Sequence, residues 1–288
     1  MTAVADILET VDWARMAEPQ ADGYDTDVTL RLAENEATPL RPHPYRRRPT
    51  EGEATFCDGA VAVRPAPPRG MMTDALLPAP VDHPNIAAGG VLLSRWPAAY
   101  RQFTRLIDTV YPYTDPEQAR MGDQALGSSS HSYEEDFGSV HATVDDPIGF
   151  AQALIHEMAH QKLRALGVSI ETADRLIANS PSEQFESPIR KDRKRPMSAV
   201  VHAQYSFIHV TALDLYMLAA ARGQRERQLI LMLLARNVPR MQSGYEEVAR
   251  HVKTDDAGRQ FIDAFMRWSS DVLARGQAEL DANGFGAP

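Results

Sequence analysis

The chain has 288 residues, of which 43% are hydrophobic and 24% are charged, as in ordinary globular proteins. Its net charge of −9 argues against a nucleic-acid binder held by phosphate contacts, and its single cysteine excludes an internal disulfide framework. The first residues lack the basic start and long apolar core of a secretory signal, and no apolar run reaches the roughly 18 residues of a membrane span. We therefore expect a cytoplasmic protein that binds neither nucleic acid nor membrane.

The first third of the chain is rich in proline, which removes a backbone donor and fixes φ. We expect a short helix over residues 1–18, followed over residues 19–90 by short strands and extended loops rather than long helices. Residues 1–90 are predicted to form an N-terminal region that packs on a catalytic domain of residues 91–288.

Apolar residues at helical spacing dominate the rest of the chain. They predict helices at residues 92–111, 147–166, 171–177, 198–222, 224–236 and 244–276. Residues 137–144 instead alternate in polarity, as a strand does. The expected fold class is mainly α (α+β), with a small, irregular sheet from the N-terminal third and residues 137–144.

The pattern His-Glu-x-x-His begins at His156 and ends at His160, within an apolar segment. Two histidines four positions apart project from one face of a helix, so both imidazoles can reach one metal ion, with Glu157 beside the first. Asp146 and the proline after it are typical of a helix start, and Gly167 is typical of a helix end. We predict that His156 and His160 are metal ligands on this helix.

A catalytic metal needs a third protein ligand and open positions for water or substrate. The extended protease pattern fails here, because Leu163 and Leu166 stand where it requires glycine and histidine. His202 and His209 lie seven positions apart, on one face of the predicted helix 198–222. A core role is the commoner one for such histidines. On spacing alone His202 is therefore a candidate third ligand beside the commoner core role, and the arginines just upstream favour the ligand. His209 is expected to be a core or supporting histidine.

A basic loop precedes His202 and contains Arg190, Arg193 and Arg195. Solvent exposure explains most arginines in such a loop. A guanidinium beside a metal also suits bidentate capture of a carboxylate.

Two segments, ALIHEMAHQKL and SPIRKDRKRPMSAVVHAQYSF, together resemble the HExxH-type peptide β-hydroxylases that depend on iron and 2-oxoglutarate. Those enzymes occur in gene clusters for ribosomally made, post-translationally modified peptides. The similarity covers about residues 125–220 and includes the serine-rich stretch SSSHSYEEDFGSVHA. Ile189 stands where the family commonly has an aromatic residue, and the basic loop is longer and more charged than is usual.

The resemblance implies Fe(II) held by His156, His160 and His202, with 2-oxoglutarate on the metal. It also implies an arginine on the distal carboxylate of the cosubstrate, with Arg195 as the first candidate and Arg190 as the second. The implied reaction is hydroxylation of a β-carbon in a peptide, such as a precursor peptide, or in a carrier-bound amino acid.

The main alternative is a zinc peptidase, in which Glu157 is the general base that activates a metal-bound water. In the oxygenase, Glu157, the same candidate catalytic residue, would either hold neighbouring groups of the site in place or supply an additional oxygen donor. A third class is a metal-stabilised binding or assembly protein without catalysis. A bound iron ion with turnover of 2-oxoglutarate to succinate supports the oxygenase. A bound zinc ion with peptide cleavage supports the peptidase.

Overall fold

The chain forms two compact units in the computed structural model, which describes residues 3–35, 48–67, 75–117 and 127–285. The helical unit comprises residues 1–36 and 162–288, and the sheet unit comprises residues 37–161. The division falls inside helix α6 (Pro147–Ala165). The predicted boundary at residue 90 lies inside the sheet unit, within helix α3 (Pro84–Leu93).

A mixed sheet organises the sheet unit, with strand order β1-β2-β4-β6-β5 and with β3 paired to β4. The strands are β1 (Thr55–Phe56), β2 (Val61–Val63), β3 (Leu77–Pro78), β4 (Thr109–Thr114), β5 (Ser130–His131) and β6 (Ser139–Thr143). Strands β2, β4 and β6 are parallel, and the other three pair antiparallel. The structure thus confirms a small sheet built in part from the N-terminal third and residues 137–144.

The helix predicted at residues 92–111 is wrong in extent, because only α4 (Pro97–Leu106) lies wholly within that range. The chain is already helical in α3, starts a new helix at α4, and becomes extended at Ile107. Strand β4 then begins at Thr109 and pairs with both β2 and β6. Two partner strands satisfy its backbone groups, so pairing between strands overrides the apolar helical spacing.

Helix α6 forms as predicted, with both predicted end signals in place. The Asp146 carboxylate accepts hydrogen bonds from the backbone nitrogens of Ile148 at 3.3 Å and Gly149 at 2.8 Å, which satisfies donors at the helix start. Past the last turn, Gly167 has φ of +89°, a conformation that suits glycine at a helix end.

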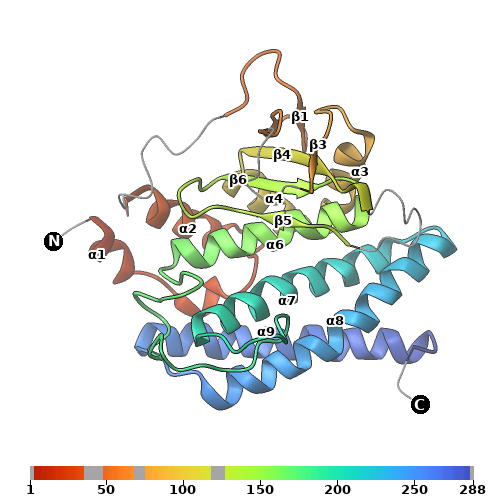
Figure 1. Cartoon of the computed structure of the whole chain (residues 1–288). Coiled ribbons are helices and arrows are strands. Elements are labelled where there is room, and N and C mark those ends of the chain that lie inside the picture. The colour runs from red at the N-terminus through yellow and green to blue at the C-terminus, as the bar shows by residue number, and fades with distance from the viewer. Residues whose placement is uncertain (1–2, 36–47, 68–74, 118–126, 286–288) are drawn as a thin grey trace. The chain divides into compact units, whose positions relative to one another are not determined.

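Three long helices, α7 (Met197–Ala220), α8 (Gln224–His251) and α9 (Asp256–Ala282), pack against one another in the helical unit (Figure 1). The first of them matches the predicted helix 198–222. The two helices predicted at 224–236 and 244–276 are wrong in extent, because α8 continues through Pro239 and the break comes only after His251. Packing of α8 on both neighbours compensates for the backbone hydrogen bond that the proline removes.

The start of the chain also differs from the prediction. The helix expected at residues 1–18 is divided into α1 (Ala3–Leu8) and a 3₁₀ turn, η1 (Trp13–Met16), and helix α2 (Tyr24–Asn35) lies in the region predicted to lack long helices. Residues 24–35 contain no proline, so nothing in that segment prevents a helix. The short helix predicted at 171–177 is wrong as well, because this segment forms bends and one bridge, between Val168 and Ala173.

Within the described residues, no helix has both the length and the apolar character that crossing a bilayer requires. The fold is mainly α, with a small mixed sheet.

A close approach at Gly258 fixes the start of α9. An added Cβ would overlap the carbonyl of Leu176, and the Asp255 carboxylate accepts hydrogen bonds from the backbone nitrogens of both residues. Gly258→Ala is therefore expected to lower the free energy of unfolding by about 1–3 kcal/mol, as measured by urea denaturation. Gly223→Ala is the control, because a Cβ there meets no atom within 4 Å. Equal losses in the two variants would contradict this account of the packing.

Candidate metal centre

The two histidines of the motif turn toward each other on α6. Their Nε2 atoms lie 3.0 Å apart, and the ring centroids of His156 and His160 are separated by 4.5 Å. Two nitrogens that each lie about 2.1 Å from one ion, at a right angle to one another, are about 3.0 Å apart. The pair therefore has the spacing of two adjacent ligands on a single metal ion.

Glu157 is held by two serine hydroxyls from the β5 region. Ser130 Oγ donates to Oε1 at 2.7 Å, and Ser132 Oγ donates to Oε2 at 2.6 Å. The glutamate is only 3% exposed, and its Oε1 lies 3.9 Å from Nε2 of His156. Because each carboxylate oxygen accepts a short hydrogen bond, the position of the carboxylate relative to the first histidine is fixed.

Gln161 attaches the same helix to β6. Its side-chain oxygen accepts from the backbone nitrogen of Gly138 at 2.6 Å, and its Nε2 donates to the carbonyl of Ser139 at 2.8 Å. The side chain is fully buried, so it satisfies two backbone groups that would otherwise be costly. The sheet thus fixes α6 directly after the second histidine of the motif.

A buried histidine on β6 extends the sheet side of the site. His141 stacks on Tyr111, with ring centroids 4.6 Å apart, and its Nδ1 lies 3.3 Å from the hydroxyl of Tyr113. Burial lowers the pKa of His141 to about 4, although the nearby Asp136 acts in the opposite direction. The imidazole is therefore neutral at neutral pH.

His202 is buried on α7, and its Nε2 lies 2.7 Å from the carbonyl oxygen of Val168. A carbonyl can only accept, so Nε2 carries the proton and Nδ1 of the neutral ring carries the lone pair that a metal needs. His209, two turns further along, is fully buried and contacts Tyr205 and Trp268 with its ring. Its surroundings are those of a core histidine.

The two candidate arginines differ in their surroundings. Arg195 donates to Glu171 at 2.7 Å, and its side chain is only 15% exposed. Arg190 forms a two-pronged pair with Asp192, at 2.9 and 3.0 Å, and more than half of its side chain is exposed. Arg195 can exchange its bond to the exposed Glu171 for a bond to a ligand, whereas Arg190 forms an ordinary surface ion pair.

In the part of the chain that the structure describes, no three His, Cys, Asp or Glu side chains form a group that could hold a metal ion. The structure brings together the histidine pair and its glutamate in the sheet unit. His202, Arg190 and Arg195 belong to the helical unit.

The two serines that hold Glu157 and the glutamine Gln161 were not among the site residues predicted from the sequence. Ser130 and Ser132 belong to the serine-rich stretch that the resemblance includes, and their spacing of two places both on one face of an extended segment. Gln161 gave no signal apart from its place beside the second histidine.

Comparison with known proteins identifies no relative: no protein-family model matches the chain, and no curated protein matches it.

Proposed function

We propose that the protein is an oxygenase that depends on Fe(II) and 2-oxoglutarate and hydroxylates the β-carbon of an amino-acid residue in a peptide or carrier-bound substrate. The observation that carries the metal site is the 3.0 Å separation of the Nε2 atoms of His156 and His160. The substrate class comes from the resemblance of the segments around His156 and His202 to the peptide β-hydroxylases.

The serine contacts bear on the role of Glu157 both in the oxygenase and in the alternative, a zinc peptidase. A general base must have a carboxylate oxygen within hydrogen-bond reach of the water that it deprotonates. In Glu157 each oxygen already accepts a hydrogen bond of 2.7 Å or less from a serine. Because each carboxylate oxygen has a second lone pair, these bonds orient Glu157 and still leave it able to accept from a water, so the preference for the oxygenase comes from the resemblance.

His156 and His160 would hold the metal, and we propose His202 as the third ligand, through Nδ1. A ligand histidine commonly donates its other ring N–H to a carbonyl, as His202 does to Val168. Bound iron would supply oxidation of an unactivated C–H bond by O₂, with 2-oxoglutarate as the co-reductant that becomes succinate and CO₂. Three neutral nitrogen ligands leave room on the metal for the cosubstrate and oxygen.

Arg195 is the proposed partner of the distal carboxylate of 2-oxoglutarate. Arg195→Lys keeps the charge but loses the two-pronged fit, so it is expected to weaken 2-oxoglutarate binding by about one to two orders of magnitude, a charge-assisted hydrogen bond being worth about 1.5–3 kcal/mol. Calorimetric titration of the anaerobic, Mn(II)-loaded protein measures the affinity. Arg190→Lys is the matched control, and a larger loss there than at Arg195 would transfer the role to Arg190.

Anaerobic spectroscopy tests the proposed chemistry before any substrate is known. A 2-oxo acid that chelates Fe(II) produces a visible metal-to-ligand charge-transfer band, whereas Zn(II), whose filled d shell is not readily oxidised, produces none. The protein with Fe(II) and 2-oxoglutarate is expected to develop this band, and His156→Ala is expected to lack it. A wild-type protein that binds zinc tightly, shows no band with iron and cleaves peptides would support the peptidase instead.

A further inference from the structure

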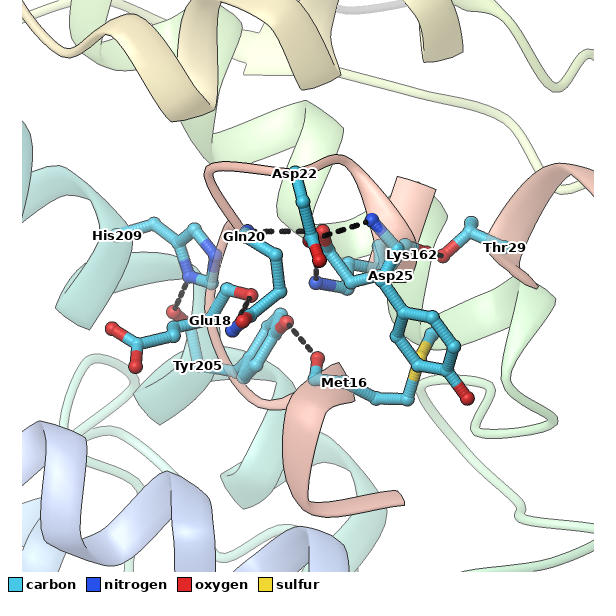
Figure 2. A network of polar contacts seen from close by, with 10 residues as sticks. Met16, Glu18, Gln20, Asp22, Asp25, Thr29, Lys162, Tyr205 and His209 are labelled. Carbon is cyan, nitrogen blue, oxygen red and sulfur yellow. Dashed lines mark hydrogen bonds and ion pairs between the residues drawn. The ribbon is translucent and has the colours of Figure 1, made fainter. Parts of the chain in front are cut away.

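A fully buried ion pair joins the end of α6 to the N-terminal part of the chain. Lys162 Nζ lies 2.5 Å from Oδ2 of Asp25, and both side chains are 0% exposed (Figure 2). The lysine is two residues beyond His160, the second histidine of the motif. Burial lowers the pKa of Lys162, and the carboxylate of Asp25 partly offsets this effect.

The segment around Asp25 is itself firmly connected. The other carboxylate oxygen of Asp25 accepts from the backbone nitrogen of Gln20 at 3.0 Å, and Thr29 Oγ1 donates to the backbone carbonyl of Asp25 at 2.6 Å. Figure 2 shows Gln20, Thr29 and Lys162 around Asp25. A single carboxylate therefore fixes a loop, the first turn of α2 and the lysine of α6 together.

The same segment also reaches α7 and α9. The hydroxyl of the fully buried Tyr205 donates to the carbonyl of Met16 at 3.4 Å (Figure 2). Tyr205 lies on α7, three residues after His202, and the turn η1 packs on α9. Residues 13–29, which we name the N-terminal brace, thus contact both helices that carry proposed metal ligands, each within one turn of a ligand.

We propose that the N-terminal brace is a positioning element for the metal centre, and that the Asp25–Lys162 pair is the contact through which it orients the histidine pair. This inference rests on the proposed function, because it requires that His156 and His160 bind metal. It assigns a role to a stretch of the first 90 residues, for which the sequence offered no functional reading.

A buried ion pair is a poor source of stability but an orientation-specific contact. Replacing such a pair by apolar residues of similar size is often neutral or stabilising, whereas removing one partner leaves a buried charge without compensation. Apolar packing would hold α6 equally firmly in several registers, while the ammonium and carboxylate meet in only one. Residues that orient ligands from outside the ligand set typically change metal affinity 10–100-fold when they are mutated.

The test is a Co(II) titration of the full-length protein, followed by visible absorption, on three proteins. The double variant Asp25→Leu/Lys162→Met removes both charges and is expected to fold with wild-type stability, yet to bind Co(II) about 10-fold more weakly and with an altered absorption band. The control is Asp22→Asn, which removes an exposed ion pair with Arg15 in the same segment and should bind Co(II) like the wild type.

The outcomes separate the brace from the proposed function. If the double variant binds Co(II) with wild-type affinity and spectrum, the brace proposal is overturned and the pair is only structural. If the wild type itself binds Co(II) no better than His156→Ala, the metal centre and the brace both fail. If the double variant does not fold, Lys162→Arg is tested in its place, because it keeps the ion pair but displaces the positive charge. Unchanged Co(II) affinity in Lys162→Arg also overturns the brace proposal.

Discussion

The His156→Ala variant is expected to lose stoichiometric metal, because the remaining protein ligands hold a divalent ion poorly. The two Nε2 atoms lie 3.0 Å apart, so removing one ring leaves the other without the partner that defines the site. Metal content after reconstitution and desalting, measured by plasma mass spectrometry, is expected to fall from about one ion per chain to near zero. His160→Ala should behave in the same way.

His251→Ala is the matched control for both histidine variants. His251 is exposed at the end of α8 and contacts Phe185 with its ring, so its loss removes an imidazole without touching the motif. This variant should retain full metal content. If His156→Ala also retains its metal and its activity, the histidine pair is not the metal site.

The Glu157→Gln variant is expected to keep its metal and to retain measurable 2-oxoglutarate decarboxylation, reduced about 10-fold. The amide has one acceptor oxygen and one donor nitrogen, so it can accept from Ser130 or from Ser132 but not from both in the present geometry. The reduction should therefore reflect a displaced side chain. The measurement is succinate formed per minute per bound iron.

Serine variants provide the control for this interpretation. Ser132→Ala removes one donor and leaves the charge of Glu157 in place, so it should lower turnover in the same direction but by less. Turnover that vanishes in Glu157→Gln with intact metal, but stays normal in Ser132→Ala, would indicate a general base and favour the peptidase.

The sequence was sufficient to predict α6 and its histidine pair. The helical spacing of apolar residues and the end signals at Asp146 and Gly167 are local features, and the structure confirms all three. The convergence of His156 and His160 follows from four-residue spacing on any helix. Local sequence patterns were therefore sufficient to predict those features that depend only on neighbouring residues, namely the helix, its two ends and the direction of its histidines.

Interactions between distant parts of the chain could not be predicted in this way. The first residues of strand β4 were included in a predicted helix because the pairing of β4 with β2 and β6 does not show in its own composition. Lys162 lies four residues after Met158 and eight after Leu154, within the buried stripe of α6, and no partner for it was predicted from the sequence. That the partner is Asp25, 137 residues away, depends on the folded chain.

The most direct test of the proposed function is a measurement of succinate from the wild-type protein, loaded anaerobically with Fe(II), supplied with 2-oxoglutarate and then exposed to O₂. The proposal predicts succinate formation that requires both iron and oxygen, that zinc does not support, and that His156→Ala abolishes. Absence of succinate from an iron-loaded protein, together with zinc-dependent peptide cleavage that Glu157→Gln eliminates, would contradict the oxygenase and identify a peptidase.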